Sequence, residues 1–134
     1  MAKAKKVKLV SFTLPNKVGQ LAAVTELIAA AKLDIKGFHA ADAGANAEFS
    51  LAVKNTAKAI KALAPLGVQA KEEDALSVEV PNKPGRLQKV ARRLADAGVN
   101  IRSSWATAFT GKTATCILIT ADDKKAIAAL EKKK

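Results

Sequence analysis

The sequence is poor in the residues that build disulfides, metal centres and many active sites. Its 134 residues include one cysteine, Cys116, and one histidine, His39. A single cysteine excludes a disulfide within the chain and a cysteine-rich zinc cluster. A lone histidine lacks the partners that catalysis or a metal site requires, so we expect His39 to serve packing or the surface. No nucleophile–base set is recognisable either. We therefore expect no catalytic residues, no metal, no cofactor and no enzymatic activity.

Aromatic residues are also scarce, at 4% of the sequence and with no tyrosine, whereas apolar residues make up 49%. The core of a globular fold must then come from Ala, Leu, Val and Ile. The N-terminal segment has no apolar stretch that could act as a signal peptide or membrane span, so no membrane partner is expected. Together with the single cysteine, this favours a cytoplasmic location.

Negative charge is in short supply, and the formal net charge is +11. Such an excess can indicate a nucleic-acid partner. Many lysines, however, lie at the two ends of the chain, namely Lys3, Lys5, Lys6, Lys8 and 132–134. RNA binding on a sheet also needs aromatic side chains on strands. The available ones are Phe12, Phe38, Phe49, Trp105 and Phe109. Nucleic acid is not the expected partner, but a basic nucleic-acid-binding protein remains an alternative.

What the sequence does contain is an internal repeat. Residues 14–40 and 80–106 align without a gap at an offset of 66, and ten of the 27 positions are identical. This similarity indicates a tandem duplication. We predict one repeat over residues 1–74 and a second over residues 75–134.

Each repeat has the pattern of a small α+β module. Apolar residues alternate over 10–14 and 76–80, as in half-buried strands, and then recur at helical spacing from Leu21 and from Leu87. Two further strands follow, joined by hairpin turns near Gly44 and around residues 110–112, and a second helical pattern comes after them.

The order predicts two ferredoxin-like βαββαβ repeats, antiparallel sheets with the helices on one face. Residues 67–73 can close the first repeat, but no closing strand is visible in the second. Its edge is then either open or covered by another chain or segment. An open edge pairs readily, which favours a homodimer.

The turn between the first strand and first helix of each repeat is the candidate site. Asn16 and Asn82 can cap the helix, and Pro84 suits its first position. Gly19 and Gly85 allow a ligand close to the backbone, and free amides at a helix start favour a carboxylate. A second recurring polar pair is Asp34 and Asn100, which could meet an ammonium group. Plain capping without a ligand would account for the same pattern.

The segment from Asn82 to Ile101, with Asn-Lys-Pro-Gly-Arg-Leu at its start and Gly-Val-Asn-Ile at its end, resembles the hallmark of ACT domains. These are amino-acid-binding regulatory modules attached to many metabolic enzymes. The first repeat resembles it too, with Val18 at the proline position, Lys32 at the glycine and Asp34 at the asparagine. The resemblance covers nearly the whole chain and suggests a free-standing tandem ACT protein.

The resemblance implies that two domains pair side by side and bind an effector at their interface. The chain would then be a non-catalytic sensor or regulator of amino-acid metabolism, acting alone or on a metabolic enzyme. Serine-binding relatives often carry histidine where Leu14 and Val80 stand, which argues against serine. A regulatory subunit that acts only through protein contacts is a further alternative. The expected ligand-binding residues are Asn16, Val18, Gly19, Gln20, Asp34, Asn82, Pro84, Gly85, Arg86 and Asn100.

Overall fold

The fold was analysed in a computed structural model that describes residues 3–107 and 111–131. Thr110, in the predicted second hairpin turn, and Phe109 lie outside the described residues. The elements are β1 (Lys3–Pro15), α1 (Gln20–Ala30), β2 (Ile35–Ala43), β3 (Asn46–Val53), α2 (Thr56–Ala62), the 3-10 turn η1 (Ala64–Leu66), β4 (Lys71–Pro81), α3 (Arg86–Asp96), β5 (Ile101–Thr107), β6 (Thr113–Thr120) and α4 (Asp123–Glu131).

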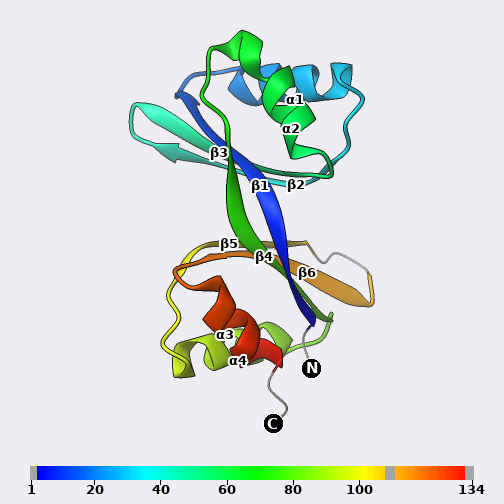
Figure 1. Cartoon of the computed structure of the whole chain (residues 1–134), viewed down its shortest axis with the longest axis vertical. Coiled ribbons are helices and arrows are strands. Elements are labelled where there is room, and N and C mark those ends of the chain that lie inside the picture. Colours follow the sequence, from blue (N-terminus) through cyan, green and yellow to red (C-terminus); the bar gives the residue numbers. More distant parts are fainter. Residues whose placement is uncertain (1–2, 108–110, 132–134) are drawn as a thin grey trace. The chain divides into compact units, whose positions relative to one another are not determined.

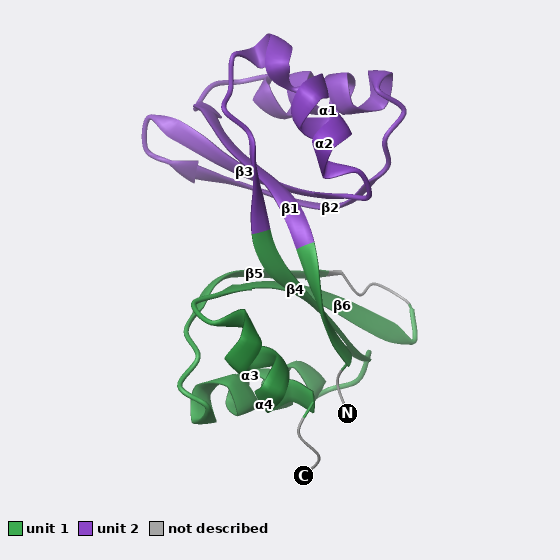
Figure 2. Cartoon of the chain, in the orientation of Figure 1, with its two compact units in different colours: residues 1–7, 74–134 green, residues 8–73 purple. Residues whose placement is uncertain are grey.

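The chain folds into two compact units, coloured separately in Figure 2. Unit 2 is formed by residues 8–73, and unit 1 by residues 1–7 together with 74–134. Each unit shows the same succession of strand, helix, strand, strand and helix (Figure 1). The strand order is β2-β3-β1-β4-β6-β5. The predicted α+β class with antiparallel strands is confirmed.

Unit 2 has a sheet built around β1. This strand pairs antiparallel with β3, with Phe12 opposite Phe49, and β3 pairs antiparallel with β2. Helices α1 and α2 lie on one face of the sheet (Figure 1). Alternation along the strands directs every second side chain toward these helices. The resulting core consists of Val10, Phe12, Leu14, Val24, Ile28, Phe49, Leu51, Val53, Ala59 and Leu63.

Unit 1 repeats this construction with β4 in the place of β1. Strand β4 pairs antiparallel with β6, and β6 with β5, while α3 and α4 share one face (Figure 1). The Arg93 guanidinium donates to the Leu130 carbonyl at 3.1 Å and so ties α3 to the end of α4. The core consists of Leu76, Val78, Val80, Val90, Leu94, Val99, Ala114, Cys116, Leu118, Ala126 and Leu130.

The edge of unit 1 is closed by residues from the beginning of the chain and not by its last residues. Residues 1–7 belong to this unit, and Ala4 packs against its core. β1 and β4 are neighbours in the strand order. Reciprocally, residues 71–73 of β4 belong to unit 2. The missing closing strand of unit 1 is therefore supplied by a segment of the same chain, and the edge is not left open. An open edge at this place no longer argues for a homodimer.

Helices α1 and α3 end in the same way. The amide of Lys32 donates to the Ala29 carbonyl and that of Leu33 to Ile28, and Gly98 and Val99 repeat both bonds in unit 1. This is the pattern of a Schellman motif, which needs a left-handed residue just beyond the helix. Gly98 has φ 75° and Lys32 has φ 60°. Lysine therefore holds a conformation that glycine adopts more easily.

Candidate ligand-binding turns

The strand–helix turns of both units have the geometry of a type II β-turn. Gly19 (φ 93°, ψ −3°) and Gly85 (φ 84°, ψ −8°) occupy the third position of these turns, where φ must be positive. Pro84 takes the second position, which its fixed φ suits. The expectation that Pro84 is the first helical residue is wrong, because α3 begins at Arg86, after the turn.

The prediction that Asn16 and Asn82 cap the helices is also wrong, because both side chains bind a hairpin instead. The Asn16 amide group donates to the Asp42 carboxylate at 2.9 Å and to the Gly44 carbonyl at 3.1 Å. The Asn82 amide group donates to the Gly111 carbonyl at 2.9 Å. Backbone bonds from Asn16 to Ala45 and from Asn82 to Lys112 accompany them. The recurring asparagine thus positions the turn against the neighbouring hairpin.

The starts of both helices remain open. Neither α1 nor α3 receives a side-chain cap from the described residues. A Cβ placed on Gly19 or Gly85 would meet nothing within 4 Å. The Gln20 side-chain amide donates to the Pro15 carbonyl at 2.8 Å, and the Arg86 backbone amide donates to the Lys83 carbonyl at 3.3 Å, so the open amides of α3 begin after Arg86. A helix start with uncapped amides attracts anions, carboxylates among them.

Apolar side chains surround these open turns. Val18 is fully exposed, and Leu21 and Leu87 are 41% and 55% exposed. The helical spacing predicted that Leu21 and Leu87 face the core together with Val24 and Val90. Both residues lie in the first turn of their helix, and their side chains are exposed.

The structure does not bring the second polar pair to these turns. Asn100 precedes β5 and its carbonyl accepts from the amide of Ala121, whereas Asn82 lies at the other end of the β5–β6 hairpin, beside Gly111. Seven residues of β5 separate the two ends, which at about 3.3 Å per residue is roughly 20 Å. Asp34 lies in the same way at the start of β2, while Asn16 contacts its far end. A single small molecule cannot contact both groups within one unit.

The strands next to Asp34 and Asn100 share an irregularity that the sequence did not predict. The register of β2 shifts between Ile35 and Gly37, and that of β5 shifts between Ile101 and Ser103. The extra residues, Lys36 and Arg102, are both exposed cations. A β-bulge redirects a side chain and is common beside functional sites. Its only signal in the sequence is the recurrence of a basic residue at the 66-residue offset, because a bulge depends on pairing between strands.

Other sequence candidates do not form sites. Burial of Cys116 raises the pKa of its thiol by desolvation, which favours the neutral thiol over the reactive thiolate. No cluster of His, Cys, Asp and Glu that could hold a metal occurs among residues 3–107 and 111–131. None of the helices in the described part of the chain has the length and apolar character needed to cross a membrane.

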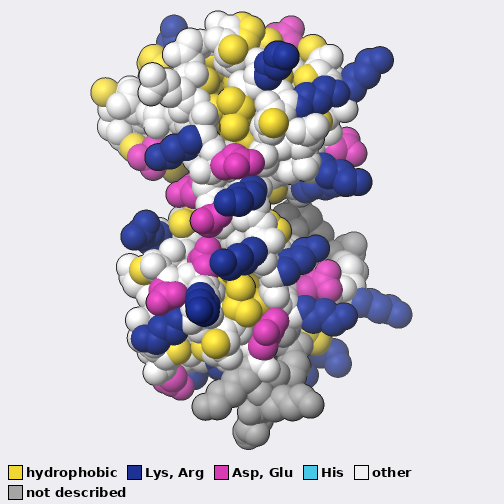
Figure 3. All heavy atoms as spheres, viewed as in Figure 1, with side chains coloured by type: hydrophobic (Ala, Val, Ile, Leu, Met, Phe, Trp, Pro, Cys, Tyr) yellow, Lys and Arg dark blue, Asp and Glu magenta, His cyan; other side chains and the backbone are white. Residues whose placement is uncertain are grey.

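The charged and aromatic side chains bear on the nucleic-acid alternative. Lys and Arg side chains are scattered over the visible face and alternate with acidic ones rather than forming one basic patch (Figure 3). Phe12 and Phe49 are buried in the core, with exposed fractions of 5% and 4%. They cannot offer their faces to bases, as RNA recognition on a sheet requires. Phe38 on β2, in contrast, is 46% exposed.

One known protein family matches part of the chain. The ACT domain family matches residues 75–133. Residues 75–133 are an ACT domain. ACT domains are regulatory, ligand-binding modules, so the chain carries a small-molecule-binding regulatory domain. The match lies in the second half of the chain, and a tandem pair of ACT domains stays a prediction.

Several solved structures resemble nearly the whole chain. A protein from Bacteroides thetaiotaomicron is 28% identical, with a TM-score of 0.86, over 96% of this chain and 88% of that one. The ligand-free regulatory subunit of aspartate kinase from Thermus thermophilus is 16% identical, with a TM-score of 0.69, over 96% and 93% of the two chains. The corresponding subunit from Thermus flavus is 18% identical, with a TM-score of 0.65, over 97% and 93%. At their low identities the two kinase subunits show a shared fold alone. No curated protein matches the chain in sequence.

Proposed function

We propose that this chain is a non-catalytic regulatory protein of amino-acid metabolism, with residues 1–74 and 75–134 as two ACT-like repeats. Its effector is a free amino acid, and its location is the cytoplasm. The match of residues 75–133 to the ACT domain supports this proposal. So does the likeness in fold to regulatory subunits of aspartate kinase, which suggests a metabolic enzyme as a partner.

The observation that carries the proposal is the uncapped helix start in each unit. The effector's carboxylate would accept hydrogen bonds from the first amides of α1 or α3, where the helix dipole also favours negative charge. Gly19 and Gly85 leave room for it. Asn16 and Asn82 would act by holding the turn in place, because their amide groups are already engaged with the hairpins.

The ammonium group of the effector needs a partner from another molecule. Because Asn82 and Asn100 lie at opposite ends of β5, one unit cannot provide both contacts. We therefore place the carboxylate on the turn of one chain and the ammonium near Asp34 or Asn100 of a second copy, in a homodimer. Such a dimer would also cover the exposed Val18 and Leu87.

Calorimetry against each of the twenty amino acids tests this proposal. At least one should bind, and sedimentation velocity should show that it shifts the protein toward a dimer. Replacing Asn100 or Asp34 by alanine should weaken binding about tenfold or more through loss of a hydrogen bond to a charged group. The matched control is Ser104→Ala, an exposed residue further along β5. The proposal fails if none of the twenty binds, or if neither alanine variant differs from the control.

A further inference from the structure

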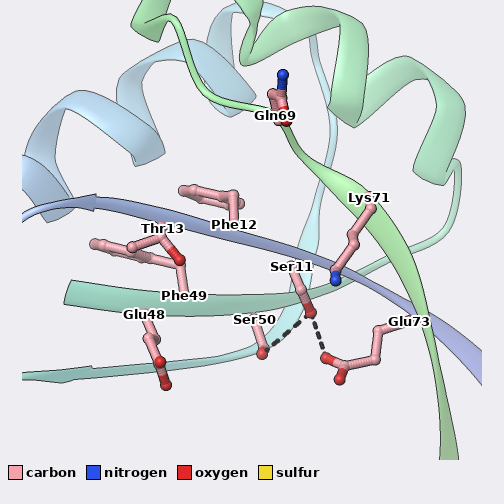
Figure 4. Close-up of a pocket in the computed structure, with 9 residues that line it drawn as sticks. All are labelled: Ser11, Phe12, Thr13, Glu48, Phe49, Ser50, Gln69, Lys71 and Glu73. Atoms are coloured by element: carbon pink, nitrogen blue, oxygen red, sulfur yellow. Dashed lines mark hydrogen bonds between the residues drawn. The ribbon is translucent and has the colours of Figure 1, made fainter. Parts of the chain in front are cut away.

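Unit 2 contains a hollow of about 550 Å³ that none of the predicted ligand-binding residues lines. Its walls are β1, β3 and the segment 69–73 that leads into β4 (Figure 4). All of its lining residues belong to unit 2. A volume between about 300 and 1,000 Å³ is usual for sites that hold small molecules.

A pair of aromatic rings on the helix side of the sheet holds together the two strands that line the hollow. Phe12 and Phe49 lie opposite each other in the β1–β3 register. Their ring centroids are 5.1 Å apart and the ring planes differ by 4°. Both rings are directed to the helix side of the sheet (Figure 4) and are almost fully buried. Packing of this kind fixes the strands that carry the polar residues of the hollow.

The polar side chains at the base of the hollow hold one another in place. The Ser11 hydroxyl donates a short hydrogen bond to the Glu73 carboxylate and lies 3.5 Å from the Ser50 hydroxyl. These three side chains come from β1, β4 and β3 and are half-buried. Figure 4 shows them converging on the side of the sheet away from the helices. The Glu73 carboxylate is held in one orientation and can accept further hydrogen bonds from a ligand.

Two charged groups at the rim have no partner of their own. Within the described residues, neither the Lys71 ammonium nor the Glu48 carboxylate makes a hydrogen bond or ion pair that would satisfy it. The hollow thus offers one cation and, with Glu73, two carboxylates. A purely anionic ligand would be repelled, and an apolar one would desolvate polar groups without compensation. A molecule with both an ammonium and a carboxylate offers an oppositely charged group to the lysine and to the two carboxylates, and the filled hollow then keeps one net negative charge.

Unit 1 lacks these features at the corresponding positions. The register that pairs Ser11 with Ser50 in unit 2 pairs Ser77 with Ile117 in unit 1. Likewise, the Phe12–Phe49 pair corresponds to Val78 and Cys116. A hydroxyl and both aromatic rings are therefore absent from this part of unit 1. This set of hydroxyl and aromatic side chains occurs in unit 2 and not at the equivalent positions of unit 1, so the shared fold does not require it.

From these observations we infer that the hollow is a second amino-acid site, in which Lys71 binds the carboxylate of the ligand and Glu48 and Glu73 bind its ammonium. The site goes beyond the proposed function, because it shares no residue with the strand–helix turns and needs no second copy of the chain. A chain with both sites can bind two different amino acids, or it can bind the same amino acid at two sites of different affinity.

The test is a titration of the ¹⁵N-labelled full chain, followed by NMR of its backbone amides. The probes are the twenty amino acids one at a time, together with propionate and propylamine, which carry only one of the two charged groups. At least one amino acid should move the amide signals of Ser11, Ser50 and Glu73 in a saturable way. Propionate should leave these signals in place, and propylamine should bind more weakly than the amino acid.

Variants then separate this site from the turns. Lys71→Met, Glu48→Gln and Ser50→Ile, which copies Ile117 of unit 1, should each weaken the hollow's affinity about tenfold or more. The matched control is Glu79→Gln, an exposed carboxylate on β4 of unit 1, and it should change nothing. Lys71 and Glu48 are exposed, so their variants keep the fold even if Ser50→Ile does not.

Two results overturn the inference: no amino acid moves the three signals, or Lys71→Met and Glu48→Gln bind as tightly as the unmodified chain. The turn sites are followed separately, through the amides of Gly19, Gly85 and Asn100. Shifts there without shifts in the hollow would remove this inference and leave the proposed function intact. Shifts in the hollow without shifts at the turns would contradict the proposed function and leave this inference intact.

Discussion

Lys32 shows how a single residue can hold an unfavourable backbone conformation because its neighbours require it. The two hydrogen bonds that close α1 demand a left-handed residue at this position, and lysine supplies it with φ 60°. At the equivalent place in unit 1 stands Gly98, with φ 75°. The repeat alignment pairs the two positions, but the sequence alone does not reveal that lysine keeps the glycine conformation.

We expect Lys32→Gly to stabilise the protein by about 1 kcal/mol, because glycine adopts a left-handed conformation without the steric cost of a side chain. Chemical denaturation should show a higher midpoint with an unchanged slope. The mirror variant, Gly98→Lys, should destabilise by a similar amount. A Cβ at Gly98 meets only the Lys125 ammonium, at 3.8 Å, so strain rather than a clash would be the cause. Equal midpoints for Lys32→Gly and the unmodified chain would contradict this account.

At the scale of elements, the strand–helix turn and the neighbouring hairpin form one structural piece in each unit. The asparagine that begins the turn donates to the hairpin, from Asn16 to Asp42 and Gly44 and from Asn82 to Gly111. The sequence predicts the turn itself, because its glycine and proline act locally. It could not predict the partner of the asparagine, because that partner lies 26 to 29 residues away.

Removing the amide group of Asn16 should destabilise unit 2 by about 1–2 kcal/mol, since two hydrogen bonds are lost. Hydrogen exchange should become faster at the β2–β3 hairpin in Asn16→Ala. The control is Asn46→Ala, in the same hairpin, whose exposed side chain has no hydrogen-bond partner among the described residues. If Asn46→Ala accelerates exchange as much as Asn16→Ala does, the asparagine does not brace the hairpin.

At the scale of the whole molecule, strands β1 and β4 are each divided between the two units. Residues 1–7 belong to unit 1, and residues 71–73 belong to unit 2. Unit 1 therefore depends on the first residues of the chain, although they lie about seventy residues before its own first strand. Ala4 packs against its core, while the neighbouring Lys5 is exposed.

We expect Ala4→Glu to destabilise unit 1 by about 2 kcal/mol, because a carboxylate would be placed against apolar side chains. Exchange should accelerate at core amides of unit 1, such as Val78 and Leu118, and not at Leu51 in unit 2. Lys5→Glu is the matched control and should have little effect, because its side chain is in solvent. Equal acceleration in both units, or none, would show that residues 1–7 do not support unit 1.

The sequence by itself determined the local elements: strands from alternation, helices from their spacing, and glycine turns, each set by residues close together in the chain. It also determined the ACT resemblance of residues 82–101, because that motif is one continuous segment. The predicted elements from Val10 to Leu14 and from Leu76 to Val80 are confirmed for the same reason.

Only the tertiary structure decided what depends on distant pairing. The first residues of the chain lie in unit 1. Asn16 and Asn82 donate hydrogen bonds to a neighbouring hairpin and do not cap a helix. Asn82 and Asn100 are separated by the length of β5. The hollow likewise exists because β1, β3 and β4 bring Ser11, Ser50 and Glu73 together. The physical reason is common to all of these: strand pairing joins residues far apart in the chain, and no local pattern records which ones meet.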